Sequence, residues 1–375
     1  MPIQLFIPTF QVDECLDEIR ICLEKGWTGM GFKTVEFEDA WKKYTGMPYA
    51  HFLSSATVGL ELAFEVLKLR NGWEDDDEVI TTPLTFISSN HAILLSKLKA
   101  VFADVNDTFC LDPKSVEERI TPKTRAVLFV GIGGNIGDYE QIVKICKEHN
   151  LALILDAAHM AGTRVNGIMP GKEADAVVYS FQAVKNLPTA DSGMICFKNG
   201  ECDTLVRKLS WLGINKDTYA RTTSGGNYKW KYDVEYIGHK DHGNSIMASI
   251  GLVQLRYLDR DNAYRRQLAA WYDSAFSGCD KIGHARIPEC CESSCHLYQI
   301  VIEDRDELMQ ALNAKEIYPG VHYIDNTQYR MYAYADGTCP KAHHISDHVL
   351  SLPMHMRLTK DDVDTITGVV LDYVR

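Results

Sequence analysis

Six apolar runs of strand length lie between residues 78 and 197, and they constrain the fold of this chain more than any other feature. Segments with helical periodicity separate several of them, such as "ISSNHAILLSKLK" from residue 87 and "DYEQIVKICKEHN" from residue 138. Such alternation is typical of a mostly parallel sheet with helices on both faces. We therefore predict an α/β fold, with this pattern covering roughly Ser54 to Phe197. The six runs occupy residues 78–83, 99–105, 125–131, 151–158, 174–181 and 193–197.

The rest of the chain predicts an extended loop region and then a second, smaller domain. Residues 214–244 are polar, aromatic and glycine-rich, which indicates a long loop region. One long helix is predicted over residues 245–276, and an α+β pattern starts at about Cys279. We expect a large α/β domain over residues 1–245, and a linking helix with a small C-terminal domain over residues 246–375. The elements expected in the small domain are strands at 295–304 and 318–325 and helices at 305–315 and 359–374.

Charge and cysteine content exclude several classes of function. The 375 residues include 39 Lys and Arg against 51 Asp and Glu, for a net charge of −12. This argues against a general role on nucleic acid or on anionic membranes. We expect no signal peptide from the start "MPIQLFIPTF", and no apolar stretch approaches the roughly 20 residues that span a bilayer. Eleven cysteines without such a signal fit reduced thiols, so we expect a cytoplasmic protein.

In open α/β sheets, ligands bind at the carboxyl ends of the strands, so the residues that follow each strand are the first candidates. Ser54, Ser55, Ala56 and Thr57 follow the run "YAHFL", where a helix is expected to begin. Exposed backbone N–H groups and hydroxyls at that position form a cup for an anion such as phosphate. Ordinary helix capping explains the same residues. No P-loop motif accompanies them.

Three more candidates follow other strands. Asp156 and His159 come after "LALIL", where a partly desolvated acid stays ionised only if a cation or donor faces it. Lys185 comes after "ADAVVYSF" with no acid beside it, so its pKa is expected to be lowered. A neutral lysine amine is a nucleophile that forms Schiff bases. Phe86 offers an aromatic face. The alternatives are a helix cap, a solvent-facing lysine and a core phenylalanine.

Other motifs give weaker signals. The glycines of "GIGGNIG", from Gly131, precede an acid at the end of the next strand, as in a dinucleotide fingerprint, but their spacing departs from it. A tight turn explains them equally well. We expect no metal site at "CCESSC", which lacks a CxxC pair, or at His344 and His348, which lack an HExxH glutamate. The basic and aromatic "NYKWKY" stretch favours an interface or a substrate loop over nucleic acid.

The strand-end candidates together fit one cofactor. Pyridoxal phosphate (PLP) needs a phosphate cup, an acid for its pyridinium nitrogen, a lysine for its aldehyde and an aromatic face over its ring. The residues after four strands of this chain supply these four elements. We therefore expect PLP as the cofactor.

The chain resembles the DegT/DnrJ/StrS family of PLP-dependent sugar aminotransferases of fold type I over nearly its whole length. "HFLSSATVGLELAF" is similar to the SSGTAAL-like phosphate loop, and "TTPLTFISSN" to TPxTFxAT. "LDAAHM" resembles the EDAAH/Q stretch, and "YSFQAVKNLPTADSG" resembles the SFxxxKxxTxGEGG stretch that carries the lysine. "IGHKDHGNSIMASIGLVQL", "SSCHLYQI" and "GVHYI" resemble further landmarks.

The resemblance implies a role for each candidate residue. Lys185 is expected to bind PLP as a Schiff base and to move the proton during transfer. Asp156 is expected to pair with the pyridinium nitrogen, and Phe86 to cover one ring face. The remaining implied contacts are His159 with the phenolic oxygen, Ala56, Thr57 and Ser180 with the phosphate, and His322 and Tyr323 with substrate. Family enzymes are dimers with shared active sites, so Lys240 and His242 are expected to reach the neighbouring site.

Several positions depart from the family pattern. Ala56 replaces a glycine, "ADSG" replaces GEGG, and His239 replaces the tyrosine of GYK. These changes leave the cofactor chemistry intact. We expect a homodimer that transfers an amino group from L-glutamate to a keto group of a nucleotide-linked deoxysugar. The alternatives are transamination of a keto-cyclitol or another small ketone, a nicotinamide oxidoreductase, and a non-catalytic PLP-fold sensor.

Overall fold

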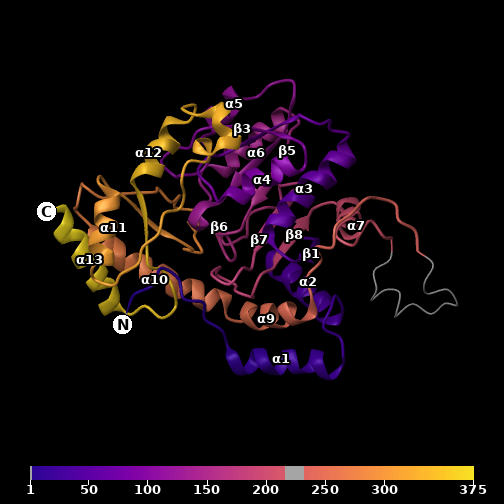
Figure 1. Cartoon of the computed structure of the whole chain (residues 1–375), viewed down its shortest axis with the longest axis horizontal. Helices are drawn as coiled ribbons and strands as arrows, with labels where there is room; N and C mark the ends of the chain where they lie inside the picture. Colours follow the sequence, from indigo (N-terminus) through magenta and orange to yellow (C-terminus); the bar gives the residue numbers. More distant parts are fainter. Residues whose placement is uncertain (1, 216–231) are drawn as a thin grey trace.

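The computed structural model of the chain describes residues 2–215 and 232–375. Its centre is a seven-stranded sheet with the strand order β1-β8-β7-β5-β4-β2-β3 (Figure 1). The pairs from β7 to β3 are parallel, whereas β8 runs antiparallel to both of its neighbours. The prediction of a mostly parallel sheet is confirmed. The strands are β1 (Tyr49–Leu53), β2 (Glu78–Thr81), β3 (Lys99–Phe102), β4 (Thr124–Val130), β5 (Ala152–Asp156), β7 (Ala176–Ser180) and β8 (Gly193–Phe197).

Helices cover both faces of this sheet, as the apolar strands predict. Every residue of β7 is buried, and successive side chains of a strand point to opposite faces. Val178 faces α3 (Ala56–Asn71), where a Cβ added at Gly59 would stand 2.8 Å from Cγ1 of Val178. The next residue, Tyr179, packs edge-on against Trp41 of α2, with ring centroids 4.9 Å apart. The sheet is thus the middle layer of three.

The helices agree with the predicted pattern except at one point. The single helix predicted over residues 245–276 is two helices, α9 and α10, with a break at Arg256 and Tyr257. Both side chains at the break bind Glu14 of α1, and Arg256 also binds Glu18 there. The helices are α1 (Val12–Glu24), α2 (Phe32–Thr45), α3 (Ala56–Asn71), α4 (Ile87–Leu95), α5 (Pro113–Glu118), α6 (Tyr139–Glu148), α7 (Gly200–Leu209), α9 (Ser245–Leu255), α10 (Leu258–Phe276), α11 (Arg305–Asn313), α12 (Pro340–His348) and α13 (Lys360–Val374), with short 3₁₀ helices η1 (Ile132–Gly134), η2 (Asn326–Gln328) and η3 (Arg330–Ala335).

The C-terminal part has a hydrophobic core of its own. Tyr272 of α10, Ile300 of β11, Leu350 of β12 and Ile366 of α13 belong to it, and all four are fully buried. A three-stranded sheet with the order β12-β11-β9 supports this core. The proposed boundary between residues 245 and 246 stays a prediction. The remaining strands are β6 (Arg164–Val165), β9 (Gly283–His284), β10 (Cys291–Glu292), β11 (Tyr298–Val301) and β12 (Val349–Leu352).

The strand predicted at residues 318–325 is wrong. The segment forms only an isolated bridge, between Gly320 and Ser351. The His322 carbonyl accepts a hydrogen bond from the Gln299 side chain, and His322 Nδ1 bonds Ser351 Oγ. These contacts hold the segment as an irregular wall beside β11 and β12.

Two further expectations are only partly covered by the described residues. Within the loop region predicted at residues 214–244, positions 216–231 lie outside the described residues, and the flanking parts make isolated bridges without strands. Among the described helices, none combines the length and apolar character that a bilayer crossing requires.

Candidate active site

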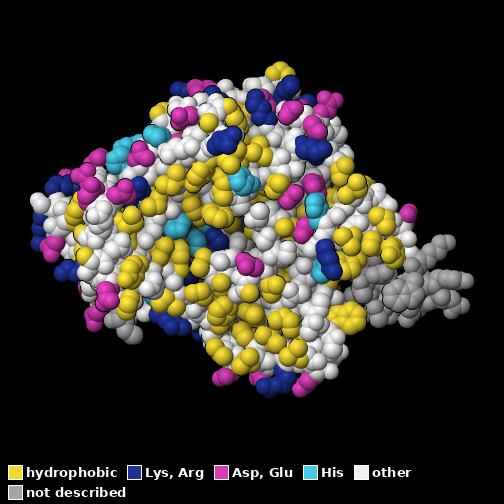
Figure 2. Space-filling view, viewed as in Figure 1, with side chains coloured by type: hydrophobic (Ala, Val, Ile, Leu, Met, Phe, Trp, Pro, Cys, Tyr) yellow, Lys and Arg dark blue, Asp and Glu magenta, His cyan; other side chains and the backbone are white. Residues whose placement is uncertain are grey.

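A cavity of about 380 Å³ lies at the carboxyl ends of β4, β5 and β7, where open α/β sheets bind ligands. Figure 2 shows a hollow near the centre of the viewed face, in which basic and histidine side chains stand among hydrophobic ones. A cavity of this size suits a cofactor or small substrate. Seven of the predicted cofactor residues, and both predicted substrate residues, line it: Ala56, Thr57, Phe86, Asp156, His159, Ser180, Lys185, His322 and Tyr323.

Asp156 ends β5 and is almost fully buried, with 3% of its surface exposed. Its carboxylate accepts hydrogen bonds from Ser89 Oγ at 2.7 Å and from the Ala158 backbone N–H at 3.1 Å. Removal from water raises its pKa, and the two donors and the charge of Lys185 oppose that rise. A buried carboxylate held in this way is suited to face a positively charged group in the cavity.

Lys185 lies on the loop between β7 and β8, on the cavity wall. Removal from water lowers its pKa to about 8, although the Asp156 carboxylate pulls in the opposite direction. A neutral amine is therefore far more accessible near neutral pH than in an ordinary lysine. The side chain is suited to act as a nucleophile and as a carrier of a proton.

His159 and Tyr323 form a hydrogen-bonded pair with a fixed direction. The Gly133 backbone N–H donates to His159 Nδ1 at 3.1 Å, so this nitrogen carries no proton. Burial and the Lys185 charge lower the pKa of His159, which keeps the ring neutral with its proton on Nε2. Nε2 then donates to the Tyr323 hydroxyl oxygen at 3.1 Å. The hydroxyl proton of Tyr323 is left to donate elsewhere.

The first turn of α3 closes another side of the cavity. Ser55 caps this helix by accepting from the Val58 N–H at 3.2 Å, as the capping interpretation predicts. Gly193, at the start of β8, permits a close approach, because a Cβ there would stand 2.6 Å from the Ala56 backbone nitrogen. The glycine of "ADSG" therefore lets β8 lie against the helix terminus.

Several cavity residues were not found by sequence reasoning. Ser89, in the first turn of α4 and three residues after Phe86, donates a hydrogen bond to the Asp156 carboxylate. His296 is buried against His159, with ring centroids 4.3 Å apart, and its Nδ1 lies 2.9 Å from Asn186 Oδ1. Phe6 stacks on His296 from the N-terminal segment.

Lys240 and His242 lie outside the cavity of their own chain, and Phe86, which lines it, is largely exposed. Lys240 is exposed and stands over the ring of Trp211, and His242 contacts the same ring edge-on. Their segment runs beside the end of β1, where the Ser54 N–H donates to the Asp241 carbonyl. Phe86 is 57% exposed and packs beside Tyr323, so the face that it offers is open to solvent in the single chain.

The glycine loop at residues 131–137 is packed into the protein. A Cβ at Gly134 would stand 2.2 Å from Ser294 Oγ, and the Gly133 N–H is already bonded to His159. The loop is thus a buried turn, and it has no room to cradle a dinucleotide.

The layered sheet and the cavity with its lysine and aspartate define a fold-type-I aminotransferase. The chain matches the DegT/DnrJ/EryC1/StrS aminotransferase family over residues 11–371 and belongs to that family. The comparison confirms the resemblance, the fold class and the assignment as an enzyme. It supports neither of the two alternatives from other classes, a nicotinamide oxidoreductase and a non-catalytic PLP-fold sensor.

Individual relatives cover almost the whole chain. The Bacillus subtilis spore coat polysaccharide biosynthesis protein SpsC is 32% identical, over 96% of this chain and 95% of its own. The aminotransferase TlmJ from Streptoalloteichus hindustanus is 30% identical with a TM-score of 0.92, and all of both chains is covered. A putative sugar aminotransferase of Streptococcus pneumoniae, known in PLP and PMP forms, is 28% identical with a TM-score of 0.89 over both full chains.

Proposed function

We propose that this sugar aminotransferase binds PLP and moves an amino group from L-glutamate to a keto group of a nucleotide-linked deoxysugar. The observation that carries the proposal is the meeting of Lys185 and Asp156 in one cavity beside the N-terminus of α3. When bound, PLP would supply an aldehyde that takes up the amino group and a ring that withdraws electrons from the reacting carbon.

The residues of the cavity fit the cofactor. Asp156 is a buried carboxylate whose pKa is raised by its removal from water, and a pyridinium nitrogen would offer it a positive charge. Free N–H groups of the first turn of α3, with the hydroxyls of Thr57 and Ser180, would hold the phosphate. Phe86 would lie against one ring face, and His159 near the phenolic oxygen.

The residues of this chain would divide the proton transfers between them. Lys185 Nζ, with a pKa of about 8, would accept a proton from the carbon of the amino donor and would later give a proton to the sugar carbon that receives the amino group. The hydroxyl of Tyr323, which already accepts from His159, donates to a polar atom of the substrate. His322 stands on the same wall, held by Ser351, and burial lowers its pKa to about 4, so it offers a neutral ring.

We propose a homodimer because α1 presents apolar side chains to solvent. Val12, Leu16 and Leu23 are 60%, 52% and 61% exposed, and Figure 2 shows hydrophobic side chains gathered over α1 and α9. Such a patch marks an interaction surface. In the dimer, Lys240 and His242 would reach the partner's active site.

The absorption spectrum of the purified protein tests the proposed function. We expect a yellow protein that L-glutamate bleaches, and a Lys185→Ala variant that is never yellow. Keto-sugar nucleotides should then restore the colour of the bleached enzyme, whereas restoration by a keto-cyclitol or a simple ketone alone would favour those substrates. A yellow protein that no amino donor bleaches would refute the proposal.

Mixing two inactive variants tests the shared active sites. Lys185→Ala and Lys240→Ala should each be inactive or weak, and their mixture should regain part of the wild-type activity if Lys240 serves the partner's site. A mixture no more active than its components would contradict that role. Light scattering on the wild type should give the mass of a dimer.

A further inference from the structure

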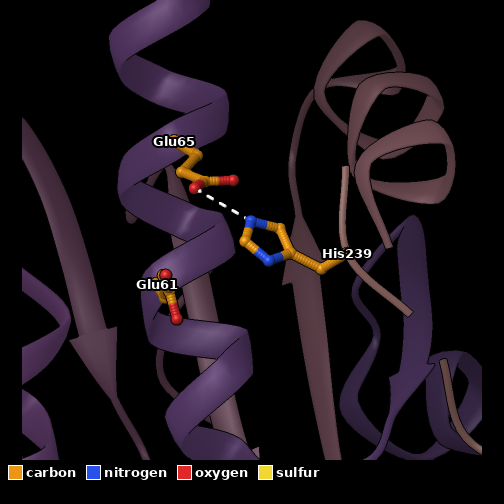
Figure 3. Close-up of side chains that lie close together, drawn as sticks. All are labelled: Glu61, Glu65 and His239. Carbon is orange, nitrogen blue, oxygen red and sulfur yellow. Dashed lines mark hydrogen bonds and ion pairs between the residues drawn. The ribbon is translucent and has the colours of Figure 1, made fainter. Parts of the chain in front are cut away.

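A second group of ligand-type side chains lies outside the cavity, on the outer side of α3. Glu61 and Glu65 are one helical turn apart and so share a face of this helix. His239, from the segment that leads to α9, points its ring at that face (Figure 3). One ligand atom from each of the three side chains lies within 4.8 Å of the other two, and all three side chains are half-buried.

Negative charge exceeds positive charge in this group. His239 Nε2 lies 3.2 Å from Glu65 Oε1, and its Nδ1 lies 4.0 Å from Asp241 Oδ2. A carboxylate oxygen of Glu61 lies within 4.8 Å of the ligand atoms of Glu65 and His239. Three carboxylates, those of Glu61, Glu65 and Asp241, thus surround one imidazole. A simple His–Glu ion pair would need only one of them.

We propose that Glu61, Glu65 and His239 bind a divalent transition-metal ion of the zinc type. Imidazole nitrogen and carboxylate oxygen at about 2.0–2.2 Å are its preferred ligands, and three protein ligands leave a fourth position to water. Two donors on one tetrahedral ion at such bond lengths stand about 3.4 Å apart, close to the 3.2 Å between His239 Nε2 and Glu65 Oε1. Glu61, whose ligand atom lies within 4.8 Å of the other two, would complete the set by turning toward the ion.

Asp241 lies beside the ring nitrogen of His239 that would not bind the ion, where it would orient the ring. Metal-bound histidines usually donate their other ring N–H to a carboxylate, which fixes the ring and its tautomer. With an ion on Nε2, the proton of His239 remains on Nδ1 and faces Asp241. Binding releases the second proton of the imidazolium to solvent, and no electron is transferred.

The ion would join two parts of the protein that meet near the cavity. It would tie α3, whose first turn lines the cavity, to the segment that carries Lys240 and His242. We therefore expect it to stabilise the fold, and the inference does not depend on the substrate of the enzyme.

Zinc titration of the untagged, chelator-treated holoenzyme tests the proposal. Isothermal titration calorimetry should give one Zn²⁺ per chain, and Zn²⁺ should raise the melting temperature. Glu61→Gln and His239→Asn should each weaken binding at least tenfold and remove the thermal shift, and Asp241→Asn should weaken binding about tenfold. Glu61→Gln keeps the shape of the side chain, and its melting temperature without zinc shows that it is folded.

His348→Asn is the matched control. His348 pairs with Glu303 at 3.1 Å and lies one turn from His344, so it forms another surface His–Glu pair. Its loss should leave zinc binding unchanged. No binding, binding that survives both Glu61→Gln and His239→Asn, or binding lost in His348→Asn would each overturn the proposal.

Discussion

Replacement of Gly193 by alanine should push the first turn of α3 away from β8. The added Cβ would stand 2.6 Å from the Ala56 nitrogen, 2.7 Å from the Ser55 carbonyl carbon and 2.8 Å from the Ser55 oxygen. All three atoms belong to the backbone, so a rotamer change cannot relieve the overlap. The turn must move by about 0.8 Å to reach ordinary contact at 3.4 Å. Overpacking of this kind costs about 1–3 kcal/mol.

Two measurements follow the consequences of that shift. Urea unfolding of the cofactor-free protein should show a free energy of unfolding lower by about 2 kcal/mol. Titration with PLP should show an affinity weaker by about tenfold or more, because the displaced N–H groups are those proposed to hold the phosphate. The first result tests the packing, and the second tests the position of the phosphate site.

Gly368→Ala provides the matched control. Gly368 lies inside α13, and a Cβ there would meet nothing within 4 Å. Alanine in a helix interior is more favourable than glycine by about 0.5–1 kcal/mol, so this variant should be more stable with unchanged PLP affinity. A Gly193→Ala protein as stable as the wild type, with the same PLP affinity, would refute the reasoning.

Three further predictions concern the cavity. Cofactor-free Lys185→Met should be about 3 kcal/mol more stable than the wild type at pH 7, because the folded-state pKa of about 8 lies well below the ordinary 10.5. The wild type should gain stability as the pH rises from 8 to 10.5, so urea unfolding should show the full difference at pH 7 and almost none above pH 10.5. Ser89→Ala removes a donor to the Asp156 carboxylate and should lower the free energy of unfolding by about 1.5–3 kcal/mol. It should also shift the acid limb of the pH–rate profile to higher pH, and an unchanged acid limb would contradict the role of Ser89. Tyr323→Phe keeps the ring beside His159 but removes the hydroxyl, and should lower kcat/KM about tenfold with little change in melting temperature.

Much of the large domain followed from local sequence. Strands such as β5 and β7 are continuous apolar runs, and burial on both faces leaves such runs few alternatives. Asp156 and Lys185 could be found because each follows such a strand, and the sheet brings the strand ends together. The fold could therefore be predicted from the pattern of apolar runs, and the candidate cofactor residues from their positions after the strands.

Features that depend on contacts between segments far apart in the sequence could not be predicted. The break between α9 and α10 coincides with ion pairs to Glu14 and Glu18, more than 200 residues earlier in the sequence. His296 meets Asn186 only because the C-terminal part folds over the sheet edge. Likewise, nothing local to His239 indicates two glutamates on α3. The local sequence indicates which helix, strand or loop a residue belongs to, but it does not indicate which distant residues that residue contacts.

Transfer of labelled nitrogen tests the central claim most directly. The holoenzyme is incubated with ¹⁵N-labelled L-glutamate and a panel of keto-deoxysugar nucleotides. The products are then separated, and their masses are measured by mass spectrometry. The account predicts an aminosugar nucleotide that carries ¹⁵N, formed by the wild type and absent with Lys185→Ala. Label that stays in glutamate with every sugar nucleotide, while a keto-cyclitol or small ketone takes it up, would contradict the account.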